Sequence, residues 1–126
     1  MTNSELITKA ASLLKPKQID KHLMGDVGCA LLTNSGHVYA GVCVETFGGM
    51  GFCAEQNAIG AMVTAGEYKI EKIVAVWRNS EGTLFVGAPC GRCREFMRQI
   101  DEHNLDAAVV LGMGAHGEIE RTPAQL

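Results

Sequence analysis

Two short cysteine segments contain the residue types of a catalytic zinc site. The first is Cys53-Ala54-Glu55, and the second, further along the chain, is Pro89-Cys90-Gly91-Arg92-Cys93. Three thiolates can fill three corners of a tetrahedron around Zn²⁺ and leave the fourth corner open for water, as catalytic zinc requires. Glu55 lies close enough to the first ligand to act as acid and base beside that water. Together the segments predict a zinc ion that activates water and a glutamate that moves the protons.

Two other interpretations explain part of the same pattern. The Cys90-x-x-Cys93 segment at a helix start could be a redox pair, in which one thiol is ionised and the other resolves a disulfide. This interpretation leaves Cys53 and Glu55 without a role. A structural zinc site in a binding module would need a fourth protein ligand, and Cys43 is the residue that could supply it. Metal content, a free-thiol count and a water on the fourth coordination position distinguish these possibilities.

Both cysteine segments are predicted to lie where a helix begins. Residues 53–65 have helical composition with Gly66 as the C-cap, and residues 90–103 have the pattern of a second amphipathic helix. The N-terminus of a helix offers partial positive charge and free N–H groups to a thiolate. Because three thiolates over-neutralise Zn²⁺, two helix starts that face each other would stabilise the site.

The remaining pattern predicts an α/β domain with a mixed sheet of about five strands flanked by helices. Asn3 or Ser4 could cap a first helix, which Pro16 would end. Asn34-Ser35-Gly36 is a hairpin turn, so the strands on either side of it should be antiparallel. The alternation of strands and helices in the second half calls for right-handed crossovers and parallel neighbours. The expected strands are residues 27–33, 38–44, 73–77, 84–86 and 107–111.

Length and composition indicate one domain over residues 1–126. Hydrophobic residues make up 47% of the chain, which favours a homo-oligomer because a monomer needs less apolar surface. The net charge of −3, without clusters of Lys and Arg, argues against a nucleic-acid partner and favours a small-molecule substrate. No apolar run has membrane-spanning length and no basic region leads into one at the N-terminus, so we expect a cytoplasmic protein without membrane contact.

The cysteine count fits a reducing compartment. Five cysteines is an odd number, whereas a disulfide scaffold of this size would have an even one. Cys29 and Cys43 lie within predicted strands, where a cysteine is more often a small buried hydrophobe than a ligand. We expect Cys29 in the core, whereas Cys43 could lie in the core or face a pocket.

The metal segments and the strands before them resemble the cytidine deaminases and the related blasticidin S deaminases. A Cys-x-Glu followed by Pro-Cys-x-x-Cys is the signature of zinc-dependent nucleobase deaminases. The resemblance implies a cytidine deaminase-like three-layer fold, Zn²⁺ bound once per chain, and a homotetramer with active sites near subunit boundaries. It also implies hydrolytic release of ammonia from an amino-pyrimidine nucleoside. The matching segments are Val27-Gly28-Cys29-Ala30-Leu31-Leu32, Gly41-Val42-Cys43-Val44-Glu45, Cys53-Ala54-Glu55 and Pro89-Cys90-Gly91-Arg92-Cys93-Arg94.

By position, the resemblance also assigns roles to single residues. Glu55 would be the proton shuttle, the Ala54 backbone would contact the ring carbonyl, and Glu45 would accept from a ribose hydroxyl. Arg92 and Arg94 lie beside or between two ligands, where either could donate to sulfur and offset the remaining negative charge. The zinc ligands would be Cys53, Cys90 and Cys93.

The chain departs from the family at the substrate and not at the metal. Cys43 replaces an asparagine that usually contacts the ribose, Gly25 replaces an aromatic that usually stacks on the base, and Gln56 replaces a common arginine. Phe47 or Phe52, on either side of the glycines, could stack on the base instead, although either could be a buried anchor of the loop. The substrate could therefore be cytidine or deoxycytidine, a blasticidin S-type nucleoside antibiotic, or another amino-heterocycle.

Overall fold

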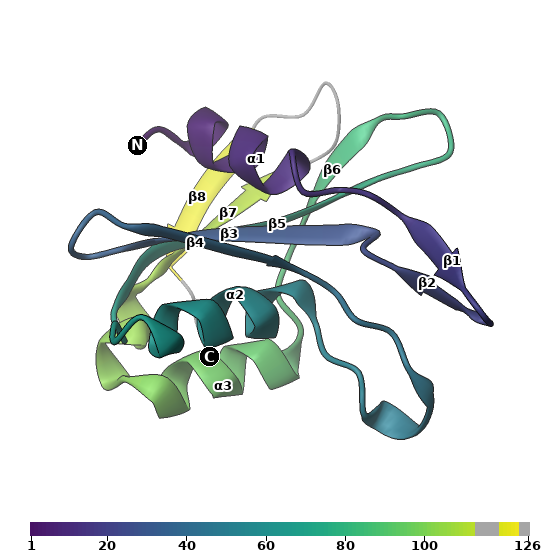
Figure 1. Ribbon diagram of the computed structural model, residues 1–126. Coiled ribbons are helices and arrows are strands. Elements are labelled where there is room, and N and C mark those ends of the chain that lie inside the picture. The colour runs from purple at the N-terminus through teal and green to yellow at the C-terminus, as the bar shows by residue number, and fades with distance from the viewer. Residues whose placement is uncertain (113–118, 124–126) are drawn as a thin grey trace.

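A mixed β-sheet lies between helix α1 on one face and helices α2 and α3 on the other (Figure 1). This computed structural model describes residues 1–112 and 119–123. The helices are α1 (Asn3–Ala11), α2 (Ala54–Thr64) and α3 (Gly91–Ile100), with the short 3₁₀ helices η1 (Phe47–Gly49) and η2 (Glu102–Asp106). The strands are β1 (Lys17–Ile19), β2 (His22–Met24), β3 (Val27–Thr33), β4 (Val38–Val42), β5 (Ile70–Arg78), β6 (Leu84–Gly87), β7 (Ala108–Gly112) and β8 (Ile119–Pro123).

The sheet has the strand order β4-β3-β5-β7-β8, and β6 pairs with β5 away from this path. The hairpin β3–β4 is antiparallel, as its turn predicts, and β3 is also antiparallel to β5. The connection through α2 leaves β4 and passes β3 before it enters β5. Consequently the expected parallel neighbours occur only at β5 and β7, within the described residues. The predicted fold class, a mixed sheet flanked by helices in three layers, is confirmed.

Both faces of the sheet are buried, which explains the nearly continuous apolar sequence of β3. Cys29 and Leu31 face α2 and α3, while Ala30 and Leu32 face α1. These side chains alternate because successive residues of a strand point to opposite faces. The two hydrophobic clusters therefore fix one helix above the sheet and two below it (Figure 1).

Local capping moves the ends of two predicted helices. The expected caps of α1, Asn3 and Ser4, lie inside the helix, because Thr2 accepts from the backbone N–H of Glu5 and the Glu5 carboxylate accepts from that of Thr2. The second amphipathic helix, expected to reach residue 103, ends at Ile100. Asp101 is extended, with φ of −163°, and its carboxylate accepts from a backbone N–H in η2.

A glycine lets α2 approach the sheet closely. A Cβ atom at Gly41 would lie 2.7 Å from the Cβ of Asn57 and 2.8 Å from the backbone nitrogen of Ala58. Nδ2 of Asn57 also donates to the carbonyl of Val42 at 3.0 Å. The first turns of α2 are therefore held directly against β4, which fixes the direction of the residues at the helix start.

The short strands β1 and β2 and the strand β8 were not expected from the sequence. Residues of β1 are exposed and lack an apolar alternation, and β8 is an edge strand of mixed composition that ends at a proline. Within residues 1–112 and 119–123, none of the helices has the length and apolar character needed to cross a membrane.

Candidate active site

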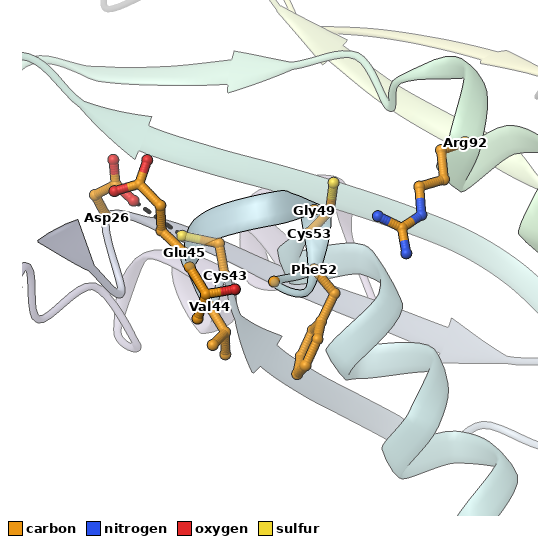
Figure 2. Close-up of a pocket in the computed structure, with 10 residues that line it drawn as sticks. Asp26, Cys43, Val44, Glu45, Gly49, Phe52, Cys53 and Arg92 are labelled. Carbon is orange, nitrogen blue, oxygen red and sulfur yellow. Dashed lines mark hydrogen bonds between the residues drawn. The ribbon is translucent and has the colours of Figure 1, made fainter. Parts of the chain in front are cut away.

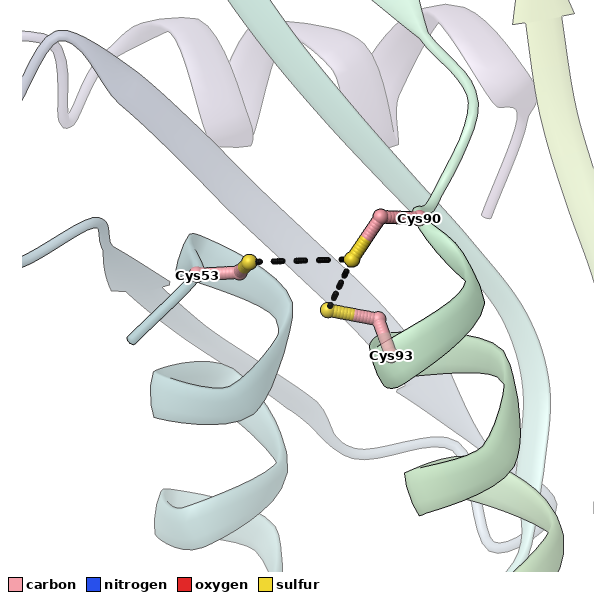
Figure 3. A group of neighbouring side chains, drawn as sticks. All are labelled: Cys53, Cys90 and Cys93. Atoms are coloured by element: carbon pink, nitrogen blue, oxygen red, sulfur yellow. Dashed lines mark hydrogen bonds between the residues drawn. The ribbon is translucent and has the colours of Figure 1, made fainter. Parts of the chain in front are cut away.

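The three cysteines of the two predicted segments meet at the start of α2 and α3 (Figure 3). Their sulfur atoms all lie within 4.8 Å of one another, with 3.9 Å between Cys53 and Cys90 and 3.6 Å between Cys90 and Cys93. Ligands about 2.3 Å from a tetrahedral zinc ion would have sulfurs about 3.8 Å apart. The donor set and its spacing therefore fit zinc. In the part of the chain that the structure describes, no other group of potential ligands meets this criterion, and Cys43 is not a member of it.

Helix starts and a glutamine position the sulfurs. Cys53 is the N-cap of α2, and its backbone N–H donates to Oε1 of Gln56 at 3.1 Å. Gln56, which replaces the arginine common in the family, thus fixes the backbone of a metal-binding residue. Cys90 is the N-cap of α3, and Cys93 lies one turn into that helix. The two helices therefore present all three thiols to one point.

The thiols differ in how readily they ionise. Burial raises the pKa of Cys53, and burial followed by the Glu55 carboxylate raises that of Cys93. Burial also acts to raise the pKa of Cys90, but donation from the backbone N–H and thiol of Cys93, the Cys53 thiol and the Arg92 N–H lowers it overall. Thiols this close together need a cation before all of them can be thiolates.

Glu55 lies in the first turn of α2 and is only 6% exposed. Burial raises the pKa of its carboxyl above the usual value. Glu55 lines a cavity of about 220 Å³ together with two of the metal-binding cysteines. A buried acid beside a metal-binding group can take up and return protons during hydrolysis. The inner cavity is lined by Val27, Cys43, Cys53, Ala54, Glu55, Ala88 and Cys90.

A second, outer cavity of about 290 Å³ adjoins the first, and Cys43 and Cys53 line both (Figure 2). It extends from the metal-binding cysteines toward the residues that precede β3 and follow β4. The two cavities together have room for a ligand with a ring at one end and a polar substituent at the other. The outer cavity is lined by Asp26, Cys43, Val44, Glu45, Thr46, Gly49, Gly51, Phe52, Cys53 and Arg92.

The structure places most of the expected substrate contacts along these cavities. Ala54 lines the inner cavity, and Cys43 lines both cavities while also packing against the core cluster below the sheet. Glu45 lines the outer cavity, where its Oε2 accepts from the backbone N–H of Leu23 in β2 at 3.1 Å. Its other oxygen is available for a ligand. Among the two aromatic candidates, Phe52 is on the cavity wall.

Phe47 lies farther out. Its side chain is 70% exposed, and its ring packs edge-on against His22 of β2 with 4.3 Å between ring centroids. In the described part of the chain it is not among the residues lining either cavity. Neither phenylalanine is a buried anchor of the loop, since Phe52 is also 38% exposed.

The two arginines differ in their contacts. Arg92 lines the outer cavity together with Cys53, as Figure 2 shows. Arg94 donates through Nε to the carbonyl of Pro89 at 3.0 Å, which ties the start of α3 to the segment before it. Arg92 is therefore the arginine positioned at the cavity, and Arg94 holds the backbone around Cys90.

Asp26 is a cavity residue that sequence reasoning missed. It directly precedes β3, and its Oδ1 accepts from the thiol of Cys43 at 2.9 Å (Figure 2). The β3–β4 register pairs Gly28 with Val42, so it brings the residues before β3 beside Cys43. A single acidic residue before a strand is usually solvated, so residue type alone does not single out Asp26. The strand register was the signal that could have placed it beside Cys43.

Comparison with known proteins agrees with this arrangement. Residues 1–112 match the family model described as the cytidine and deoxycytidylate deaminase zinc-binding region. The chain is 33% identical over 101 residues to a blasticidin-S deaminase of Bacillus cereus, covering 76% of this chain and 69% of the relative. It is 39% identical over 101 residues to cytidine deaminase 3 of Arabidopsis thaliana, covering 77% of this chain but only 42% of that protein.

Structural comparison gives the same result. The crystal structure of a cytidine deaminase from Burkholderia pseudomallei superimposes with a TM-score of 0.74 and 29% identity, covering 98% of this chain and 94% of the other. A cytidine deaminase from Bacillus anthracis, 20% identical, superimposes with a TM-score of 0.72. The superposition covers 96% of this chain and 82% of that chain, which shows the shared fold. The family match spans both cysteine segments. This chain therefore belongs to the cytidine and deoxycytidylate deaminase family.

Proposed function

We propose that this protein is a zinc-dependent hydrolase that releases ammonia from an amino-pyrimidine nucleoside of the cytidine or deoxycytidine type. One observation carries the proposal: a buried glutamate lines the same cavity as thiols whose spacing fits tetrahedral zinc. Membership of a zinc-binding deaminase family supports the metal and the reaction type. The zinc ligands are Cys53, Cys90 and Cys93.

Glu55 performs the proton transfers in the proposed mechanism. When bound, zinc acts as a Lewis acid and supplies an activated water as the nucleophile. The Glu55 carboxylate accepts a proton from the attacking water and gives it to the ring nitrogen adjacent to the attacked carbon. It then takes the second proton from the hydroxyl added to the ring carbon and gives it to the amine. The carbon–nitrogen bond breaks as the ring carbonyl forms and ammonia leaves, so one residue serves as base and later as acid. The buried position keeps this carboxyl group away from bulk water.

Other cavity residues orient the substrate. The Ala54 backbone contacts the ring carbonyl, and the available oxygen of Glu45 accepts from a ribose hydroxyl. Phe52 is the better placed aromatic for contact with the base, and Phe47 would have to move from its exposed position. Arg92 offsets the negative charge of the thiolates.

Blasticidin S-type nucleoside antibiotics are the second candidate substrates. A relative named blasticidin-S deaminase is 33% identical to this chain, which supports this alternative. The replacement of the usual asparagine by Cys43 and of the usual aromatic by Gly25 also weakens the expected fit to cytidine. Both candidates use the same metal and the same proton shuttle.

We also propose a domain organisation, an assembly and a location for this protein. Residues 1–126 form a single catalytic domain, and the chain assembles as a homo-oligomer, with a tetramer favoured. Exposed apolar side chains on the loop and hairpin near the cavity support assembly; they include Ile19, Leu23, Phe47, Met50 and Phe52. We place the protein in the cytoplasm, where its five thiols stay reduced.

Zinc content and ammonia release, measured on the same variants, test this function. Parent protein should hold about one zinc per chain and release ammonia from cytidine, deoxycytidine or blasticidin S. Cys53→Ala, Cys90→Ala and Cys93→Ala should each lose the metal, whereas Cys29→Ala should keep it. Glu55→Gln should keep zinc and fold yet lose activity by a factor of roughly a hundred or more.

Two results would contradict the assignment. Full zinc retention in all three cysteine variants would place the metal elsewhere. Activity of Glu55→Gln within a few-fold of the parent would exclude Glu55 as the proton shuttle.

A further inference from the structure

We propose, on the basis of the deaminase function proposed above, that Asp26 is a specificity-determining residue of the active site. Together with Glu45 it selects substrates that carry hydrogen-bond donors, and above all a positive charge, at the end remote from the reacting ring. A negatively charged substituent at that end is rejected.

The position of Asp26 connects it to the chemistry. Cys43 lines both the inner cavity, where Glu55 lies, and the outer cavity, where Asp26 lies. The carboxylate of Asp26 accepts from the Cys43 thiol at 2.9 Å. A ligand whose ring reaches Glu55 and whose other end extends past Cys43 therefore meets Asp26.

The Asp26 carboxylate retains capacity to bind a ligand. A carboxylate has two oxygens with about four acceptor positions, whereas a thiol is a weak donor that occupies one of them. The Glu45 carboxylate also retains acceptor positions, because within residues 1–112 and 119–123 its hydrogen bond is to the N–H of Leu23. Two partly satisfied acceptors thus face the same cavity.

The charges around the outer cavity are separated. In Figure 2 Asp26 and Glu45 lie on one side of the cavity, whereas Arg92 approaches from α3 on the opposite side. These are the charged side chains among the described residues that line this cavity. A cation placed between the two carboxylates would be attracted, and a phosphate there would be repelled.

The replacement of asparagine at position 43 strengthens this selection. An asparagine amide can both donate to and accept from a substrate, whereas the Cys43–Asp26 pair offers acceptor oxygens and a negative charge. A substrate group at this point must therefore donate. A hydroxyl meets that requirement, and an ammonium group meets it with the added benefit of its charge.

The experiment compares cytidine analogues that carry a neutral, a cationic or an anionic group at the sugar. The probes are cytidine, its 3′- and 5′-amino-deoxy analogues, and its 3′- and 5′-monophosphates, with ammonia release and equilibrium binding measured for each on zinc-loaded protein. For the parent we expect at least one amino analogue to exceed cytidine in kcat/KM by about tenfold, with both phosphates poorer than cytidine.

Variants then assign the preference to Asp26. Asp26→Asn should lose most of the tenfold preference, mainly through KM, and should accept the phosphates better. Asp26→Glu should keep the preference because it keeps the charge. Glu102→Gln is the matched control, since it removes one negative charge beyond the far end of α3, and it should leave the ranking unchanged.

The outcomes separate this inference from the proposed function. Equal use of cationic, neutral and anionic probes by the parent, or an unchanged ranking in Asp26→Asn, overturns the role of Asp26 while leaving deamination intact. If no probe releases ammonia, the proposed function fails, and the binding ranking still decides the inference. A preference of the parent protein for the phosphates over cytidine would by itself refute the role of Asp26.

Discussion

At the scale of single residues, surroundings decide what each cysteine can do. Cys29 is fully buried among the side chains of the core below the sheet, and burial, followed by the Glu55 charge, holds the pKa of its thiol well above the usual value. It therefore serves as a small apolar residue. The metal-binding cysteines instead lie at helix starts: Cys53 and Cys90 are N-caps and are partly or fully exposed, whereas Cys93 is buried in the first turn of α3. Cys43 lies between these extremes, facing the cavities.

Glu45 offers a test of substrate binding at one residue. In Glu45→Gln we expect kcat/KM for a nucleoside to fall about tenfold while use of the free base is spared, because the lost contact lies away from the reacting carbon. Deamination of cytidine and of cytosine should be compared directly. Glu71→Gln, an exposed substitution on β5, is the control.

An equal loss with both compounds would give Glu45 a different role. Its carboxylate also accepts from Leu23 of β2, so such a result would mean that it acts by holding the β1–β2 hairpin beside the cavity.

Residue types identify the metal site better than they identify the substrate site. Cys53, Glu55 and the Pro89–Cys93 segment are recognisable because zinc and its proton shuttle require particular side chains at close spacing. Asp26 has no such requirement, and its role appears only when the hairpin register brings it beside Cys43. A substrate contact can be made by many residue types, so local sequence does not reveal it.

At the scale of elements, close packing of α2 on β4 fixes the active site. The first turn of α2 carries Glu55 and follows Cys53, so any shift of this helix moves both relative to α3. Gly41 allows the approach, and Asn57 secures it with a hydrogen bond to β4. The helix position is therefore set by a strand residue that takes no part in the chemistry.

Gly41→Ala should destabilise the protein and impair the site together. The new methyl group would overlap Asn57 and the backbone of α2, so we expect the free energy of unfolding to fall by about 1–3 kcal/mol. Urea unfolding monitored by circular dichroism measures this, alongside zinc content and turnover. Gly60→Ala is the matched control in α2, because a Cβ at this position meets nothing within 4 Å. It should raise the free energy of unfolding by up to about 1 kcal/mol.

A Gly41→Ala variant as stable and active as the parent would show that α2 can shift without cost. The site would then depend on the metal, and not on packing, for its geometry.

Elements with a strong pattern of apolar residues can be predicted from the sequence, whereas exposed strands and strands at the edge of the sheet cannot. The limits of β3 follow from its buried apolar run, and the start of α2 from its cysteine segment. The β1–β2 hairpin and the edge strand β8 lack that signal, because an edge or exposed strand needs no alternating apolar residues. The early end of α3 depends on the backbone of Asp101, which composition does not determine.

At the scale of the whole molecule, the cavities share one end with a group of exposed apolar residues on the β1–β2 hairpin and the loop that carries η1. The β1–β2 hairpin, the loop that carries η1 and the starts of α2 and α3 lie together at that end (Figure 1). Met50 of this loop is 84% exposed and Phe47 is 70% exposed. An apolar surface beside an active site is expected where a second copy of the chain covers it.

Assembly should therefore depend on this loop. We expect light scattering to give about four times the chain mass of 13.5 kDa, and Met50→Glu to shift the protein toward smaller species, because a charge buried at an apolar interface is unfavourable. Thr8→Glu, on the exposed side of α1, introduces the same charge and should preserve the assembly. If subunit contacts complete the cavity mouth, activity per chain should fall with dissociation in Met50→Glu while zinc content stays unchanged. A parent protein that is monomeric at micromolar concentration and fully active would show that the exposed apolar end needs no partner.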